Sequence, residues 1–291
     1  MPYATMSDGV KLYYEEAGSG TPILFVHEYA ADWRGWEPQM RFFPRRHRCI
    51  TYSFRGYTPS DVPDDPTKYG QDRVVDDMRD MLAALKIERA HVVGLSMGGF
   101  AVAHFARKYP GLALSTCICG CGFGAEKNLH ARFAAEATAN AGRIRQQGQR
   151  AFADAYSVGP SRQRHRQKDP RGYLEFVEQL RAHDATGAAH TMQEFQGKRP
   201  SLYDFEAEWA ACKVPALIIA GDEDDNVLIP SVWLKRVMGN AGLLVIPKAG
   251  HTVNLEEPDA FNRALWDFIV LVEAGKWLPR ETPLGPGPVF R

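Results

Sequence analysis

The first candidate for chemistry in this sequence is a serine between glycines. Ser96 lies in Gly94-Leu95-Ser96-Met97-Gly98 and matches the pattern Gly-x-Ser-x-Gly. Small residues two positions before and after the serine permit a sharp turn between a strand and a helix, which lifts the hydroxyl above the edge of a sheet. With glycine at about 7 % of residues, the bare pattern arises by chance in on the order of a tenth of chains of this length. The residues around it must therefore decide its meaning.

The flanks of Ser96 fit the strand and the helix that such a turn requires. The apolar run His91-Val92-Val93 precedes it and is typical of a buried strand, and residues 100–109 have a helical pattern that ends before Pro110. A glycine-rich turn that only packs a helix on a strand is the alternative interpretation. The strand–turn–helix context favours a nucleophile.

A serine nucleophile needs two partners, because a neutral hydroxyl reacts weakly. Four acidic residues, Asp222 to Asp225, follow the apolar run at 215–220 directly. Further on, Gly250-His251 follows the apolar run at 243–246. An acid and a histidine that each follow a buried strand are candidates for the orienting acid and the base of a catalytic triad. A surface loop histidine is the alternative for His251.

The elements that must position these residues alternate along the chain. After a hairpin around Asp8-Gly9, short apolar runs typical of buried strands occur at residues 22–27, 49–54, 90–95, 112–119, 215–220 and 243–246. Helical patterns occur between or after them at residues 73–85, 97–109, 231–238 and 259–272. This alternation predicts an α/β fold with a mostly parallel central sheet and helices on both faces.

The alternation stops in the middle of the chain. Residues 125–211 show helical patterns only, at 129–145, 148–156 and 172–190. We therefore expect a discontinuous core of residues 1–124 and 212–275, an inserted helical cap at 125–211, and a Pro-rich tail at 276–291. The insertion leaves the sheet at the edge that carries Ser96, so it is predicted to cover that edge and line a substrate pocket. Apolar candidates for the lining are Phe133, Tyr156, Phe176 and Phe195.

Composition narrows the functional classes. The 291 residues carry 35 basic and 35 acidic side chains, and this balance gives no electrostatic attraction to nucleic acid or to an anionic membrane. No apolar run approaches the ~20 residues that span a bilayer, and the first residues show no secretory pattern. Five cysteines without metal-ligand spacing fit reduced, buried thiols, so we expect a cytoplasmic protein. The cluster of basic residues at 143–168 is interpreted as a solvent-exposed face of the helices. The alternative interpretation is a binding site for anionic substrates or for a partner.

Together these motifs resemble the α/β-hydrolase fold superfamily, in its branch of esterases, lactonases, carbon–carbon bond hydrolases and cofactor-free haloperoxidases. The likeness extends over residues 3–272 and rests on the hairpin, the strand ending in His27, Arg55-Gly56, residues 94–99, the acidic loop at 221–225 and Gly250-His251. The chain order Ser, Asp, His is the one that this fold uses. The motifs are specific for the fold and not for the substrate.

The resemblance implies a role for individual residues. Ser96 corresponds to the nucleophile and His251 to the base, while the acid, usually third after the glycine that closes its strand, corresponds to Asp224. Asp222 is the second choice for the acid and Asp225 a weaker one. The backbone N–H groups of Met97 and of Tyr29 correspond to the oxyanion hole.

One position departs from the family pattern. The family usually has His-Gly after the strand that ends at His27, whereas this chain has His27-Glu28-Tyr29. In the favoured interpretation Glu28 points away from the site as a neutral structural substitution. In the alternative, its carboxylate narrows the substrate range or acts as a second acid or base.

The leading interpretation of function is a carboxylesterase-like serine hydrolase that cleaves a small ester or lactone through an acyl-enzyme. A carbon–carbon bond hydrolase or a perhydrolase with the same triad is one alternative, and a ligand receptor that retains a slow triad is another. The resemblance implies no cofactor and no metal, and a small-molecule substrate as partner. It argues against epoxide hydrolysis and dehalogenation, because those enzymes carry Asp where this chain has Ser96. A homo-oligomer is left open.

Overall fold

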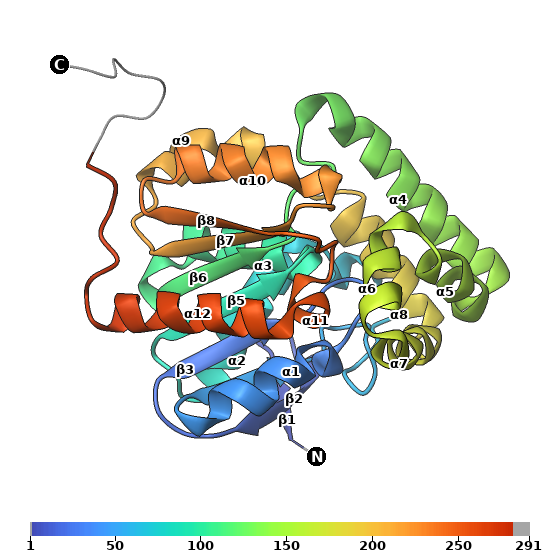
Figure 1. The fold of residues 1–291 in the computed structure, drawn as a ribbon. Helices are drawn as coiled ribbons and strands as arrows, with labels where there is room; N and C mark the ends of the chain where they lie inside the picture. The colour runs from blue at the N-terminus through green and yellow to red at the C-terminus, as the bar shows by residue number, and fades with distance from the viewer. Residues whose placement is uncertain (1, 282–291) are drawn as a thin grey trace.

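The computed structural model describes residues 2–281 and contains, within them, one eight-stranded sheet. The strands follow the order β1-β2-β4-β3-β5-β6-β7-β8 across the sheet. Their bounds are β1 (Tyr3–Thr5), β2 (Lys11–Ala17), β3 (Pro22–Val26), β4 (Arg48–Tyr52), β5 (Ala90–Leu95), β6 (Ala113–Cys119), β7 (Ala216–Gly221) and β8 (Ala241–Ile246). Strands β3 to β8 are parallel, and β1 and β2 add an antiparallel edge. The predicted α/β fold with a mostly parallel sheet is confirmed (Figure 1).

Helices cover both faces of the sheet because its strands are apolar on both sides. On β3, Leu24 packs into the core beneath α2 (Gln71–Ala84), α3 (Met97–Lys108) and α10 (Asp225–Val237), whereas Phe25 packs into the opposite core with Trp36. That second core lies beneath α1 (Glu37–Phe42) and α12 (Pro258–Glu273). Successive side chains of a strand point to opposite faces, so one apolar run supplies both cores.

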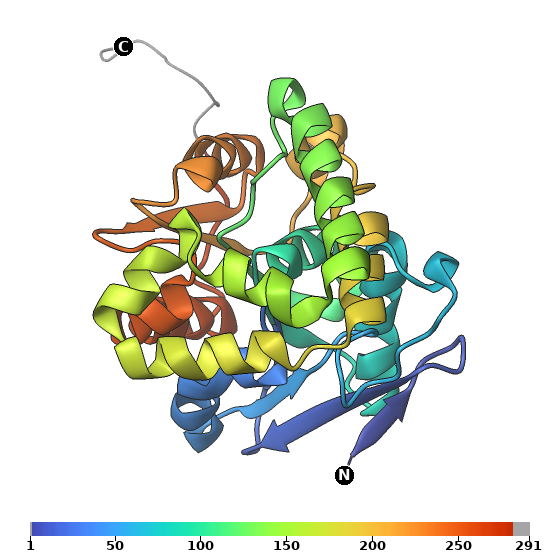
Figure 2. The same cartoon turned by 90° about the vertical axis from the view of Figure 1, so that its right-hand side faces the viewer.

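The middle of the chain leaves the sheet and forms a separate group of helices. These are α4 (Lys127–Gln147), α5 (Gln149–Ser157), α6 (Gln163–Lys168), α7 (Pro170–Arg181), α8 (Ala185–His190), a π-helix at Thr191–Gln196 and α9 (Glu206–Ala211). Residues 125–211, all of which the structure describes, contain no strand. Figures 1 and 2 show α4 to α8 gathered at one end of the sheet, whereas α9 returns to the layer beside α10.

Two predicted helices differ from the observed ones. The pattern at residues 172–190 forms two helices, because Asp184 starts a new one by accepting hydrogen bonds from the N–H groups of Thr186 and Gly187. Helix α10 begins at Asp225, six residues before the predicted start at Ser231, and contains Pro230. Because proline is unfavourable inside a helix, the sequence pattern placed the start of this helix after Pro230.

The C-terminal end of the described chain packs against α12. Trp277, at the start of the predicted Pro-rich tail, packs on Phe268 of α12 with ring centroids 4.6 Å apart and donates a hydrogen bond to the Asn240 carbonyl. The rest of the tail, residues 282–291, lies outside the described residues.

Among the described helices, none has the length and apolar character needed to cross a membrane.

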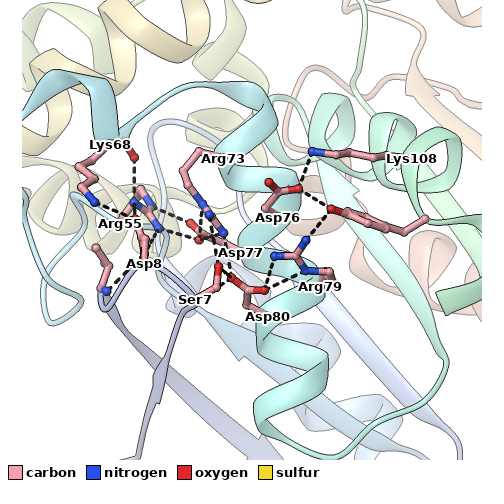
Figure 3. A network of polar contacts seen from close by, with 12 residues as sticks. Ser7, Asp8, Arg55, Lys68, Arg73, Asp76, Asp77, Arg79, Asp80 and Lys108 are labelled. Carbon is pink, nitrogen blue, oxygen red and sulfur yellow. Dashed lines mark hydrogen bonds and ion pairs between the residues drawn. The ribbon is translucent and has the colours of Figure 1, made fainter.

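A polar network fastens the N-terminal hairpin to the sheet (Figure 3). The Arg55 guanidinium donates to both carboxylate oxygens of Asp77 at 2.7 Å and to Asp8 at 2.8 Å. Arg73 joins Asp77 and Asp80 in the same network. Arg55 and Asp77 are fully buried, so the Arg55-Gly56 motif holds the hairpin turn, the loop after β4 and helix α2 together. The motif is therefore part of the scaffold.

Candidate active site

Ser96 occupies a strained turn between β5 and α3. Its backbone has φ 54° and ψ −113°, a conformation that costs a non-glycine residue of order 1–3 kcal/mol. A Cβ at Gly98 would collide with the carbonyl oxygens of Val26 and His27, so the sequence pattern is required by close packing of the turn on β3. Strain that the surrounding packing maintains is characteristic of functional positions. The turn places Ser96 at the carboxyl end of the sheet.

An acid–histidine pair lies at the same edge. Asp224 follows β7 and His251 follows β8, and parallel neighbouring strands bring these loops together. The Oδ2 atom of Asp224 lies 2.5 Å from Nδ1 of His251, and both residues are buried. Asp222 instead accepts a hydrogen bond from the backbone N–H of Ala249 at 3.2 Å, and Asp225 forms the first turn of α10. Of the three candidate acids, the structure places Asp224 against His251.

The surroundings of His251 make it more basic. Burial by itself lowers the pKa of the imidazole, but the charge of Asp224 and its hydrogen bond raise the pKa above the ordinary value of 6.5. Arg162 opposes this rise and Glu28 supports it. The Asp224 hydrogen bond at Nδ1 also leaves Nε2 free to face the cavity, the orientation that a general base requires.

Ser96 and His251 line one cavity of about 900 Å³. Within the described residues the Ser96 hydroxyl makes no hydrogen bond to His251. Such contacts are often long without substrate and tighten when substrate binds. The cavity lies between the sheet edge and helices α4 to α6, and the residues 192–199 complete its wall. Its volume suits a small molecule.

The two backbone N–H groups predicted for an oxyanion hole belong to Met97 and Tyr29. Met97 begins α3, where the first N–H groups have no partner within the helix, and Tyr29 lies in the loop after β3. Neither N–H donates to another of the described residues. The Tyr29 carbonyl accepts a hydrogen bond from the Tyr57 hydroxyl at 2.8 Å, and the Tyr29 hydroxyl donates to the Ala188 carbonyl at 3.2 Å. These contacts hold both the backbone and the side chain of Tyr29 in place.

Glu28 lies beside His251 without lining the cavity that contains Ser96, so the favoured interpretation, in which it points away from the site, is wrong. Its Oε2 atom is 4.0 Å from Nε2 of His251. Arg162, from the helical insertion, holds both of its carboxylate oxygens at 2.7 and 2.5 Å and also donates to the Tyr156 hydroxyl at 2.9 Å. Burial raises the pKa of Glu28, but the adjacent guanidinium outweighs burial and keeps the pKa below its ordinary value. The sequence could not show this because 134 positions separate the two residues.

Removal of Arg162 should reveal the role of this ion pair in stability. Arg162→Met leaves the Glu28 carboxylate buried without a partner, and we expect the free energy of unfolding to fall by about 3–5 kcal/mol. The double variant Glu28→Gln/Arg162→Met has no charge at either position of this pair and should recover most of that loss. Urea denaturation followed by circular dichroism measures both values.

A matched control is Arg171→Met, which breaks a solvent-exposed pair with Glu175 and should leave the urea midpoint unchanged. A double variant as unstable as Arg162→Met would show that lost packing, rather than the unpaired carboxylate, causes the destabilisation.

The four apolar lining candidates divide into two pairs. Phe133 and Tyr156 line the cavity with Ser96. Phe195 is fully buried in the core and Phe176 faces a different cavity beside His165, so the prediction that these two line the pocket is wrong. An apolar pattern marks the buried side of a helix but not which cavity that side meets.

Three of the seven basic residues at 143–168 pair with acidic residues of the core, and the other four are exposed, as a solvent-exposed face requires. Arg164 pairs with Glu223 and Lys168 with Glu257, in addition to the buried pair of Arg162 with Glu28. Arg143 lines the cavity. Sequence reasoning missed the lining residues Met192, Gln196 and Arg199, which follow the predicted helices and carry no motif. Their one local signal is the π-helix, which is frequent at functional sites but has no sequence signature.

His27 connects two of the loops beside the site. His27 accepts from the Phe54 N–H through Nε2 and contacts the Glu28 carbonyl through Nδ1 at 2.6 Å, and burial lowers its pKa to about 4. It is therefore a neutral bridge between the loops after β3 and β4. Among the described residues, no group of three or more His, Cys, Asp and Glu side chains is arranged to hold a metal ion.

Comparison with known proteins agrees with this geometry. A model of the alpha/beta hydrolase family matches residues 23–264. The chain is 33 % identical to Epoxide hydrolase 1 of Caenorhabditis elegans over 112 residues, which span 38 % of this chain and only 28 % of that protein. It is 26 % identical over 280 residues to the putative 2-succinyl-6-hydroxy-2,4-cyclohexadiene-1-carboxylate synthase of Bacillus subtilis (strain 168), covering 92 % of this chain and 98 % of that protein.

A solved structure shows the same fold. The enol-lactonase from Burkholderia xenovorans LB400 superposes with a TM-score of 0.80 at 24 % identity, covering 92 % of this chain and 100 % of that one. The family match extends from β3 through β8 and the insertion to the first seven residues of α12, and therefore over every element that carries the site. The chain belongs to the alpha/beta hydrolase family of enzymes.

Proposed function

We propose that this enzyme is a serine hydrolase that cleaves a small carboxylic ester or lactone through an acyl-enzyme intermediate. The observation that carries the proposal is the buried Asp224–His251 pair, joined at 2.5 Å, in the same cavity as the strained Ser96 turn. A buried acid that orients a histidine beside a serine is the arrangement by which hydroxyl nucleophiles are activated.

The proposed reaction has two halves. The Ser96 oxygen attacks the carbonyl carbon while Nε2 of His251 takes the hydroxyl proton, and the Met97 and Tyr29 N–H groups bind the negative charge on the carbonyl oxygen. Collapse breaks the bond to the leaving alcohol, which receives the proton from His251. A water molecule then attacks the acyl-enzyme while His251 accepts its proton, and His251 returns that proton to the Ser96 oxygen as the carboxylic acid leaves.

The Glu28–Arg162 pair lies where charge develops in this reaction. His251 becomes an imidazolium in each half, and the Glu28 carboxylate 4.0 Å from Nε2 favours that charged form. A free carboxylate at this place would oppose the neighbouring oxyanion, and the bidentate contact with Arg162 offsets its charge. Because Arg162 belongs to the insertion, the same contact supports the proposal that residues 125–211 act as a cap over Ser96.

The similarity to an epoxide hydrolase does not extend to the proposed nucleophile, because this chain has Ser96 where the resemblance implies Asp in those enzymes. The relative from Bacillus subtilis is named as a synthase, so the test of function must include outcomes other than ester hydrolysis. Cleavage of a carbon–carbon bond next to a ketone and perhydrolysis use the same triad. A receptor would keep the cavity and turn over slowly.

A substrate panel separates these possibilities. We expect p-nitrophenyl esters of short acids and simple lactones to be hydrolysed, and rapid mixing with p-nitrophenyl acetate to release a burst of nitrophenol with an acyl group on Ser96, found by peptide mass spectrometry. Turnover of a vinylogous diketone in preference to every ester and lactone would contradict the proposal and select carbon–carbon hydrolysis. An acyl-enzyme that forms but does not turn over would indicate a receptor.

A further inference from the structure

Arg199 is a buried cation in the wall of the active-site cavity. It follows the π-helix, is 4 % exposed, and lines the cavity that contains Ser96 and His251. Its guanidinium carbon lies 3.6 Å from the centre of the Phe100 ring and 4.4 Å from that of Phe133. The two aromatic rings therefore hold the planar group in place while it stays next to the cavity.

The hydrogen bonds of Arg199 leave its charge uncompensated. Nη1 donates to the side-chain oxygen of Gln196 and Nη2 donates to the Phe123 carbonyl at 2.6 Å, and both acceptors are neutral. These bonds account for two of the five N–H donors of a guanidinium. Among residues 2–281, no carboxylate lies within ion-pair distance of Arg199. Burial lowers the pKa of Arg199 to about 9, which still leaves the group charged at neutral pH.

The other fully buried arginines of the described chain differ in this respect. Arg55 is paired with Asp77 and Asp8, and Arg162 is paired with Glu28. A buried charge without a partner is costly, which is why buried arginines are generally paired. Arg199 departs from this pattern at the one place where a substrate could supply the missing anion.

The carboxylates that line the cavity do not pair with Arg199. Asp224 is paired with His251, Glu136 with Arg132 and Glu223 with Arg164, and Asp225 lies in the first turn of α10. All four line the cavity. The anion that meets Arg199 must therefore come from outside the described chain.

We propose that Arg199 binds a carboxylate of the substrate, so that the enzyme acts on an ester or lactone that also carries a free carboxylate group. This inference rests on the proposed function and assigns its substrate class. Phe100, on which Arg199 stacks, lies one helical turn from Ser96, about 6 Å along the helix axis. The carboxylate is therefore a few bonds from the scissile carbonyl. A planar guanidinium suits a carboxylate because it donates two parallel hydrogen bonds.

Matched substrates test the proposal. Monophenyl esters of succinate, glutarate and adipate are compared with the corresponding methyl phenyl diesters, and release of phenol reports cleavage of the phenyl ester alone. We expect wild-type kcat/KM to favour the free carboxylate at least tenfold for one of these lengths. Arg199→Gln should lower kcat/KM for that substrate about 10- to 100-fold, mainly through KM, and change the methylated partner less than threefold.

Arg143→Gln is the matched control, because Arg143 lines the same cavity from an exposed position and bonds to Asn140. It should change the ratio of the two substrates less than threefold. If Arg199→Gln does not fold, competitive inhibition of the wild-type enzyme still decides: glutarate should inhibit, and glutaramide, which is neutral and contains no ester, should not. Inorganic phosphate that inhibits more strongly than every dicarboxylate would overturn the assignment of a carboxylate.

The proposal is also wrong if wild-type enzyme shows no preference at any length, or if Arg199→Gln keeps the preference. Arg199 would then be a structural clamp between two rings. Thermal unfolding separates this failure from failure of the proposed function, because it needs no turnover. Glutarate should raise the melting temperature of the wild type and not that of Arg199→Gln, even if no ester is hydrolysed.

Discussion

Ser96→Ala is expected to reduce kcat/KM for a p-nitrophenyl ester by about 10⁴-fold or more and to leave the fold intact. The hydroxyl forms the covalent bond in the proposed reaction, and no other side chain can replace it once the acyl-enzyme route is closed. The substitution by alanine should leave no void in the hydrophobic core, because Ser96 is half-buried at the edge of the cavity. Steady-state kinetics measures the loss, and circular dichroism confirms the fold.

Ser161→Ala is the matched control for this variant. Ser161 lines the same cavity but follows no strand, so its removal should change kcat/KM less than threefold. A fluorophosphonate should label the wild type and the Ser161 variant at Ser96 and should not label the Ser96 variant. Labelling at another residue, or full activity in Ser96→Ala, would remove Ser96 from the mechanism.

The second large effect is expected at the acid. Asp224→Asn should lower kcat by about 10⁴-fold, because an amide at this position favours the wrong tautomer of His251 and no longer stabilises the imidazolium. The variant keeps the size of the side chain, so the site geometry should persist. The 2.5 Å contact to Nδ1 is the structural basis of this expectation.

The pH profile adds a readout that a structural role would not change. His251 must be neutral to accept a proton, so kcat/KM falls as pH falls through the pKa of His251, which Asp224 helps to raise above 6.5. The acid limb of the wild type should therefore have its midpoint above pH 6.5. In Asp224→Asn the loss of the carboxylate lowers that pKa, and the residual activity should show a limb at lower pH.

Asp222→Asn provides the control for the acid. Its side chain accepts a hydrogen bond from the Ala249 N–H, which an asparagine oxygen can also accept, so activity should stay within tenfold of the wild type. If Asp222→Asn lost more activity than Asp224→Asn, Asp222 would be the orienting acid.

The sequence was sufficient for those parts of the enzyme that depend on local patterns. Alternating apolar runs predicted the order of strands and helices, because burial on both faces of a parallel sheet requires near-continuous apolar strands. Gly94 and Gly98 around Ser96 predicted the strained turn, because only glycine permits the close contact of Gly98 with β3 and of Gly94 with the start of α3. The positions of His251 and of the acidic loop after strands predicted that they would share one edge of the sheet.

The resemblance ranked Asp224 first among the neighbouring acids, but the contact with His251 that distinguishes it depends on tertiary structure. Asp222, Asp224 and Asp225 occupy one short loop, and the path of the backbone after β7 decides which carboxylate meets His251. In the same way, apolar periodicity marked Phe176 and Phe195 as buried without showing that they meet a different cavity and the core. Periodicity reports which side of a helix is buried and not what lies against it.

Charge pairing over long separations was also decided by tertiary structure alone. Glu28 was visible as a departure from the family pattern, yet its position beside His251 depends on Arg162, 134 positions away. Arg199 was invisible as a functional candidate, because its distinguishing property is the absence of a carboxylate partner among the described residues, and only a folded chain has partners. Sequence patterns determine local conformation and burial, whereas the balance of charge in a buried site depends on which distant side chains the fold brings together.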